Sequence, residues 1–245
     1  MKLLLDLGNT RLKWGVHGDG RWLAQGALEY DHLERLAPEI LGAGRPHVAV
    51  GANVAGARRA AEVEMALPAG LEVRWNLARE RQCGVVNRYL RANQLGADRW
   101  AALIGARHLH RGAALVVMAG TATTVDLLDA DGGFDGGLIL PGLALMRRSL
   151  ARDTSDLPFA DGRHVPRPRR TEDAIVSGCL EAQVGAIERM FARCAPAQDP
   201  ICLLSGGAAG VIAPALEVPC RQIGNLVLEG LARIAEDRDN ITPLK

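Results

Sequence analysis

The sequence contains an internal repeat whose two copies are offset by 112 residues. Each copy reads as an apolar strand, a small polar turn with Gly and Thr, a second strand, an Asp-Gly turn and a third strand. Asp-Gly between apolar runs is a strong hairpin signal. A duplicated β-β-β unit is therefore expected, because repeats of this kind mark repeated structure. The aligned positions are residues 3–5 with 115–117, Gly8 with Gly120, residues 19–20 with 131–132, and Trp22 with Phe134.

After each copy, helical periodicity alternates with short apolar strands. This order predicts an α/β protein with two domains, residues 1–112 and 113–245, and a cleft between them. Residues 152–170 are polar and hold three prolines, which predicts a long mobile loop. The predicted helices are 31–43, 55–66, 98–110, 171–193 and 224–236, the predicted strands are 47–51, 71–75 and 201–204, and a helix or loop follows Gly206 and Gly207.

Composition excludes several classes of function. With 245 residues, of which 48% are apolar, the chain can bury two cores. A net charge of +1 gives no reason to expect nucleic acid or an anionic membrane as partner. The five cysteines are scattered without a CxxC pair, and no apolar run is long enough to span a bilayer or act as a signal peptide. We expect a cytoplasmic protein with reduced thiols.

The turn in the first copy, residues 6–10 (DLGNT), has the composition of a phosphate site. No GxxxxGK[ST] or GxGxxG motif is present, so any such site uses other groups. Gly8 permits close backbone approach, and the N–H groups of residues 8–11 with the Asn9 amide and Thr10 hydroxyl can donate to phosphate oxygens. Asp6 suits Mg²⁺, directly or through water, and Lys13 can meet a phosphate as a point charge.

A tight hairpin built from good turn formers explains residues 6–10 equally well. The second copy favours the phosphate interpretation, because it carries its own hydroxyl-rich turn at residues 120–124 (GTATT). Two such turns, one in each domain, can hold a triphosphate from both sides.

Six short motifs occur in one order along nearly the whole chain. With them the chain resembles the type III pantothenate kinases, a family of the acetate/sugar kinase, Hsp70 and actin superfamily. The resemblance implies two duplicated ribonuclease-H-like domains of the actin-like ATPase and sugar kinase fold. It also implies a homodimer that uses ATP to phosphorylate the 4′-hydroxyl of pantothenate, which opens coenzyme A synthesis. The motifs are DLGNT at 6–10, GADR at 96–99, GTATT at 120–124, GGLILPG at 136–142, TEDAIVSG at 171–178 and SGG at 205–207.

The resemblance also implies the roles of single residues. Asp98 corresponds to the catalytic base, although an ordinary helix N-cap is an alternative interpretation. Arg99 corresponds to a ligand of the pantothenate carboxylate, with a solvated arginine as the alternative. Tyr89 and Thr171 correspond to substrate contacts, with a partly buried tyrosine and an N-cap threonine as alternatives. The implied substrate-binding residues are Tyr89, Gly96, Ala97, Asp98, Arg99 and Thr171, and the implied ATP-binding residues are Asp6, Leu7, Gly8, Asn9, Thr10, Arg11, Leu12, Lys13 and Thr121.

One position departs from the family pattern. Many members carry an aspartate three residues before the threonine of the GTA motif, where it binds K⁺ or a similar monovalent cation such as NH₄⁺. Here that residue is Met118, and a thioether is a poor ligand for a hard cation. The monovalent cation site is therefore in doubt. Asp126 is a nearby carboxylate, but strand alternation can aim it elsewhere or make it a satisfied polar residue of the sheet.

Two other functions remain open at this point. One is a nucleotide-binding regulatory protein that keeps the fold without turnover, against which the intact Asp6, Asp98 and Arg99 argue. The other is a different enzyme of the superfamily, such as an N-acetylglucosamine kinase or an exopolyphosphatase. The GADR segment argues against this second alternative.

Overall fold

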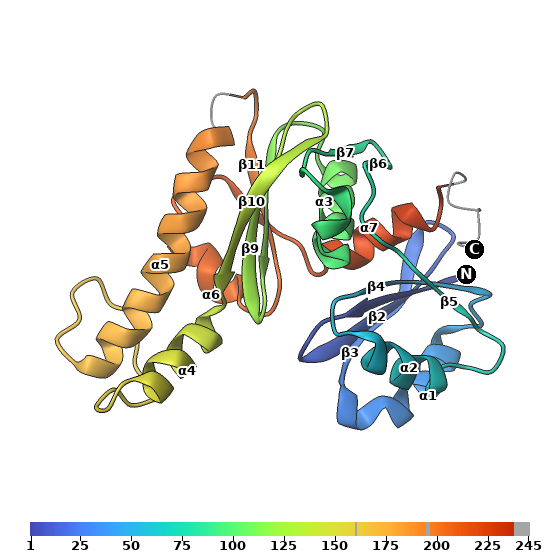
Figure 1. Ribbon diagram of the computed structural model, residues 1–245, viewed down its shortest axis with the longest axis horizontal. Coiled ribbons are helices and arrows are strands. Elements are labelled where there is room, and N and C mark those ends of the chain that lie inside the picture. Colours follow the sequence, from blue (N-terminus) through green and yellow to red (C-terminus); the bar gives the residue numbers. More distant parts are fainter. Residues whose placement is uncertain (160, 195–196, 238–245) are drawn as a thin grey trace. The chain divides into compact units, whose positions relative to one another are not determined.

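The computed structural model describes residues 1–159, 161–194 and 197–237 (Figure 1). These residues form two compact units. The first contains residues 1–110, 132–134 and those from 225 onward, and the second contains 111–131 and 135–224. The prediction places one boundary between the two domains, at residue 112. In the structure the chain crosses between the units more than once, and the residues after Gly224 belong to the first unit again.

The first unit contains a five-stranded sheet in the order β3-β2-β1-β4-β5. β2 runs antiparallel to β1 and β3, whereas β4 runs parallel to β1 and β5. The elements of this unit are β1 (Lys2–Leu7), β2 (Arg11–Gly18), β3 (Arg21–Glu29), η1 (Tyr30–Arg35), α1 (Leu36–Ala43), β4 (Val48–Asn53), α2 (Ala57–Met65), β5 (Val73–Trp75), β6 (Arg81–Gln82), β7 (Val85–Asn87), η2 (Ala92–Gln94), α3 (Ala97–Leu109) and α7 (Leu226–Ile234).

Strand alternation gives β1 two different faces. Leu3, Leu5 and Leu7 pack into a core with residues of α1 and α2. Leu4 and Asp6 therefore lie on the other face, which α3 and α7 cover (Figure 1). Asp6 is thus a carboxylate on the helix-covered face of a buried strand.

Helices α3 and α7 pack with their backbones in close contact at two glycines. A Cβ atom on Gly230 would overlap the carbonyl oxygen of Ala101. A Cβ atom on Gly105 would lie 2.5 Å from the carbonyl oxygen of Leu226. Only glycine permits this approach, so the two positions fix how closely α7 supports the helix that begins at Ala97.

The second unit contains strands in the order β12-β11-β8-β9-β10. Residues Leu115 and Val117 of β8 pack against Ile187 and Phe191 of α5. Gly133 and Phe134, at the start of β10, belong to the first unit and pair with β7. The elements here are β8 (Ala114–Ala119), β9 (Ala122–Leu128), β10 (Gly133–Pro141), α4 (Leu143–Asp153), α5 (Thr171–Cys194), β11 (Ile201–Ser205), α6 (Ala209–Ile212), η3 (Ala213–Ala215) and β12 (Cys220–Gln222).

The structure confirms the repeat. Adding 112 to the bounds of β1 and β3 gives the bounds of β8 and β10. The orders β3-β2-β1-β4-β5 and β10-β9-β8-β11-β12 correspond strand by strand. β9 begins one residue earlier than this offset predicts, because the second turn has two residues where the first has three.

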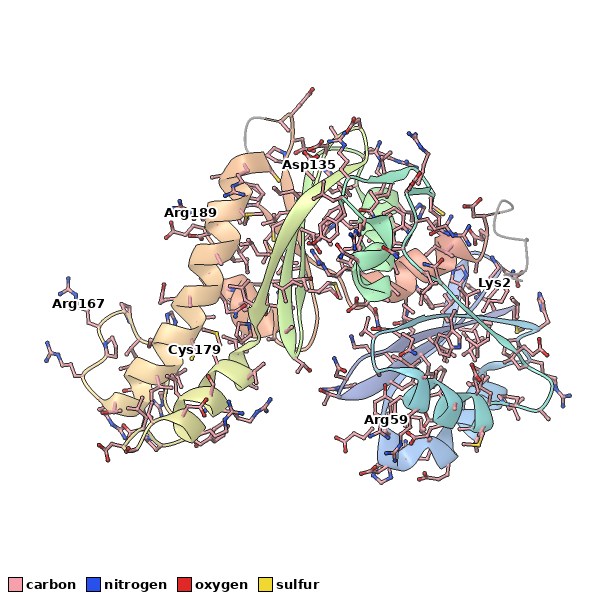
Figure 2. The ribbon with its side chains drawn as sticks, viewed as in Figure 1. Lys2, Arg59, Asp135, Arg167, Cys179 and Arg189 are labelled. Atoms are coloured by element: carbon pink, nitrogen blue, oxygen red, sulfur yellow. The ribbon has the colours of Figure 1, made fainter. Side chains whose placement is uncertain are left out.

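Other predictions differ in detail. The predicted helix 31–43 is divided into η1 and α1, with non-helical dihedral angles at His32. Helix α4 occupies a region where no helix was predicted. In the predicted loop, the backbone N–H groups of Arg163 and Val165 donate to Asp173 and Ser177 of α5, while the exposed Arg167 points away from that helix (Figure 2).

Within the described residues, no helix has the length and apolarity needed to cross a membrane.

Candidate active site

The sheet register places Lys13 directly opposite Asp6. The two residues are partners in the β1–β2 pairing, and the Lys13 Nζ lies 3.2 Å from the Asp6 Oδ2. Asp6 is 4% exposed, whereas the Lys13 side chain is one-third exposed. Lys13, which was predicted to meet a phosphate, therefore forms an ion pair with Asp6, the carboxylate that was predicted to hold the metal ion.

Burial raises the pKa of Asp6. Lys13 lowers this pKa by its charge and its hydrogen bond, and the charge of Asp98 raises it further. Asp98 therefore lies near enough to Asp6 for its charge to raise the pKa of Asp6. A site with this arrangement favours a cation, because added positive charge offsets both burial and repulsion.

The turn after β1 is closed by its own backbone. The Gly8 N–H donates to the Arg11 carbonyl at 3.3 Å, so it is used within the turn, contrary to its predicted role as a phosphate donor. The hydroxyl of Tyr30 donates to the Gly8 carbonyl oxygen at 2.7 Å. The exposed residues of the turn are Asn9, Thr10 and Arg11.

Two of the predicted ATP ligands have side chains in the core. Leu7 and Leu12 pair with one another across the hairpin, and both are fully buried among the residues that pack on α1 and α2. Any contact of these two residues with a nucleotide is therefore limited to their backbone atoms.

Helix α3 presents Asp98 in its first turn. The N-cap is Gly96, so the interpretation of Asp98 as the N-cap is wrong. The Asp98 Oδ1 accepts a hydrogen bond from the Arg99 N–H at 2.8 Å, and a Cβ atom on Gly96 would lie only 2.7 Å from that oxygen. Glycine at 96 and the small Ala97 thus leave room for a half-buried carboxylate at the start of the helix.

Arg99 is buried rather than solvated, which corrects the alternative interpretation of this residue. It is 5% exposed, and its Nη1 donates to the Tyr89 hydroxyl at 3.1 Å. Its guanidinium carbon lies 5.7 Å from the centroid of the Tyr89 ring and 5.8 Å from that of Phe134. Phe134 was not among the predicted site residues, although its alignment with Trp22 marks an aromatic position in both copies.

The ends of three elements meet beside this cluster. β1 and β4 are parallel, and the N–H of Val54 after β4 donates to the Leu7 carbonyl at 3.1 Å. The Val54 Cγ1 lies 3.8 Å from the Cβ position of Gly96, which places the start of α3 at the same edge. The carboxyl ends of parallel strands are the usual place for ligands in α/β folds.

Thr121 and Thr171 belong to the second unit. Thr121 is exposed in a turn that the Gly120 N–H closes on the Ala122 carbonyl at 3.0 Å. Thr171 is the first residue of α5, and the Ala174 N–H bonds to the Arg170 carbonyl. The N-cap position is therefore Arg170 rather than Thr171. Thr171 instead lines an apolar pocket of about 610 Å³ between α4 and α5.

Met118 and Asp126 share one face of their sheet. Met118 pairs with Thr124, and Val116 pairs with Asp126, so alternation aims all four side chains to the same side. Asp126 is 1% exposed, and a Cβ atom on Gly137 would overlap its Oδ1. Alternation therefore does not turn the Asp126 carboxylate away from Met118, and this carboxylate is buried on the same face of the sheet.

Within the described residues, no group of three or more His, Cys, Asp or Glu side chains is arranged to hold a metal ion. Asp6, buried and under the influence of Asp98, nevertheless fits a divalent cation that takes most of its ligands from phosphates and water. Such a cation needs only one or two protein carboxylates.

The chain is similar to known proteins over nearly its whole length. A sequence model of the type III pantothenate kinase family matches residues 2–193. The chain is 54% identical to the type III pantothenate kinase of Aromatoleum aromaticum, covering 97% of this chain and 98% of that protein. It is 53% identical to the enzyme of the same name from Azoarcus sp., covering 96% and 90%.

Solved structures agree on the fold. A conserved protein from Campylobacter jejuni superposes with a TM-score of 0.64 at 19% identity, over 98% of this chain and 100% of that chain. The ethanolamine utilization protein EutJ from Carboxydothermus hydrogenoformans superposes with a TM-score of 0.57 at 16% identity, over 94% and 88%. At these identities the likeness concerns the fold alone.

The fold and the sequence matches together define a phosphotransferase of the actin-like ATPase and sugar kinase class, with duplicated ribonuclease-H-like domains. Within that class, the chain belongs to the type III pantothenate kinase family.

Proposed function

We propose that this protein transfers the γ-phosphoryl group of ATP to the 4′-hydroxyl of pantothenate, with Asp98 as the base. The observation that carries the assignment is the grouping of Asp98, the buried Arg99 and the ion pair of Asp6 with Lys13 in one unit. The family to which the chain belongs supports the identity of both substrates.

Asp98 is suited to position the attacking hydroxyl. Phosphoryl transfer needs an in-line oxygen and neutralised charge more than covalent help. The hydroxyl oxygen forms a bond to the γ-phosphorus as the bond to the β-phosphate oxygen breaks, ADP leaves, and the hydroxyl proton passes to Asp98. Its first-turn position supports this role, because the carboxylate is held by the Arg99 N–H while remaining half-exposed.

Arg99 is suited to recognise the carboxylate of pantothenate. Its guanidinium lies against two aromatic rings, which limits its rotamers, and the planar fork of a guanidinium matches the geometry of a carboxylate. Tyr89 orients Arg99 through its hydroxyl, and the backbone of Gly96 and Ala97 borders the same position. We assign substrate contacts to these residues on that basis, and to Thr171 on the resemblance alone.

The phosphates of ATP are assigned to the exposed part of the first turn, and Thr121 is assigned to ATP binding on the resemblance alone. Asp6 would hold Mg²⁺, directly or through water, and the ion would neutralise charge on the phosphates when bound. The Lys13 ammonium group would then interact with both the Asp6 carboxylate and the phosphates of ATP. A monovalent cation is not assigned, because Met118 replaces the family's aspartate.

A homodimer in the cytoplasm completes the proposal. The homodimer is proposed on the resemblance to the family, and two apolar side chains of the second unit, Ile139 at 66% and Phe159 at 60%, are exposed. Light scattering at micromolar concentration tests this association, and a monomer throughout would refute it.

The decisive experiment is a coupled assay of ADP release with ATP, Mg²⁺ and pantothenate. We expect release that depends on pantothenate and saturates with it. The same assay without pantothenate measures ATP hydrolysis and serves as the control. Absence of pantothenate-dependent ADP under every cation tested would refute the proposal, and tight ATP binding without turnover would favour a regulatory role instead.

A further inference from the structure

A side chain outside the predicted site holds the phosphate turn. Tyr30, the first residue of η1, is 8% exposed and donates its hydroxyl proton to the Gly8 carbonyl oxygen at 2.7 Å. The two residues are 22 positions apart in the chain, so an element beyond the hairpin restrains the turn.

This hydrogen bond sets the direction of the next backbone N–H. In a trans peptide the carbonyl of one residue and the N–H of the following residue point in opposite directions. None of the described peptide bonds is cis. Because the Gly8 carbonyl points to Tyr30, the Asn9 N–H points away from it. The Gly8 N–H closes the turn on Arg11, so the Asn9 N–H is the next donor along the turn for a phosphate.

Tyr30 is itself held firmly. Its ring belongs to the core that contains Leu33 and Ile40, and the guanidinium carbon of Arg59 lies 4.2 Å from the ring centroid. Arg59, labelled in Figure 2 on α2, also donates to Glu62 at 2.7 Å. Burial raises the pKa of Tyr30 to about 12, so the hydroxyl keeps its proton and remains a donor at neutral pH.

We infer that Tyr30 is a positioning residue for ATP, which acts by fixing the peptide between Gly8 and Asn9 so that its N–H faces the phosphates. The inference rests on the proposed function of the turn. A donor oriented before binding lowers the entropy cost of capturing the ligand. A tyrosine that only filled the core would affect stability and leave nucleotide binding unchanged.

The chain contains two tyrosines, which allows a matched test. Tyr30→Phe removes the hydroxyl on the ATP side, and Tyr89→Phe removes the one that accepts from Arg99. We expect Tyr30→Phe to raise the KM and the dissociation constant for ATP by about 3- to 10-fold, the range of one lost hydrogen bond. Its KM for pantothenate should not change, whereas Tyr89→Phe should raise only the KM for pantothenate.

Calorimetry with ATP alone separates this inference from the proposed function, because it needs no pantothenate. An unchanged dissociation constant for ATP in Tyr30→Phe would overturn the inference, as would equal shifts of both KM values. Weaker ATP binding in that variant supports it even if no pantothenate is phosphorylated. A wild-type protein that binds no ATP would overturn the inference and the proposed function together.

Discussion

Two carboxylates in the first unit have different surroundings and therefore suit different roles. Asp6 is buried and paired with Lys13, whereas Asp98 is half-exposed at the start of α3. Environments that differ in this way separate the tasks of two acids in one site. The surroundings of Asp6 suit a carboxylate that binds a cation, and those of Asp98 suit a general base that takes a proton from the substrate.

Asp98→Asn should lower kcat at least about 100-fold, the scale of lost acid–base catalysis, because the amide keeps the shape but cannot take the proton. Glu39→Gln is the matched control, since Glu39 also lies in the first turn of a helix of the same unit. Steady-state kinetics of both variants, with calorimetry for ATP, tests the assignment. Near-normal turnover in Asp98→Asn would show that this carboxylate is not the base.

The free energy of unfolding of the Asp6→Asn variant, relative to that of the wild type, should increase as the pH rises. Burial raises the pKa of Asp6, with Lys13 opposing and Asp98 adding to the shift. A group whose pKa is higher in the folded than in the unfolded state makes its full contribution to the free energy of unfolding at pH values below its unfolded-state pKa. This contribution is lost as the pH rises through the folded-state pKa. The asparagine variant has no such loss.

Urea unfolding at a series of pH values from about 4 to 8 measures this difference, whose slope cannot exceed about 1.4 kcal/mol per pH unit for one carboxyl group. The variant should also lose turnover if Asp6 holds the metal. A stability difference that stays constant with pH would contradict the prediction.

The sequence pointed to candidate residues for the site, but it did not reveal their surroundings. Turn composition and the resemblance led to Asp6 and Asp98. The pairing of Asp6 with Lys13 depends on strand register, which one strand alone does not reveal. The burial of Arg99 depends on Phe134, which lies 35 positions later in the chain and meets it only after folding.

At the scale of elements, the close packing of α3 and α7 supports the helix that carries Asp98. Gly230→Ala should destabilise the protein by about 1–3 kcal/mol, the usual cost of overpacking, because its Cβ atom would overlap the Ala101 carbonyl. Gly185→Ala in α5, where a Cβ atom meets nothing within 4 Å, should instead stabilise by about 0.5–1 kcal/mol. Equal effects of the two changes in chemical denaturation would contradict this account.

Long periodic elements were predictable, and short ones were not. Helices α3 and α5 lie within one residue of their predicted bounds, because many apolar positions specify each of them. β6, β7 and β12 have two or three residues each, too few to show alternation. The predicted helix 31–43 is interrupted at His32, whose dihedral angles are not helical, and α1 begins at Leu36, so that Pro38 lies in the first turn, where proline is tolerated.

At the scale of the whole molecule, the two copies of the repeat share their strands but differ at the position that Asp6 occupies in the first copy. Asp6 corresponds to Met118 at the offset of 112. We therefore expect turnover to lack a strict requirement for K⁺ or NH₄⁺. Assays in Na⁺, K⁺ and NH₄⁺ salts at equal ionic strength test this expectation, and Met118→Asp should introduce a dependence. Strict dependence in the wild type would point to Asp126, which shares the Met118 face, as a cation ligand.

The position of α7 has a consequence for how the chain folds as it is synthesised. All of the second unit, up to Gly224, is translated before α7, yet α7 packs on α3 and β1 of the first unit. During synthesis the elements of the second unit thus emerge from the ribosome before the helix that the first unit still lacks. The strands that are translated first are therefore covered by α7 only after every element of the second unit has been synthesised.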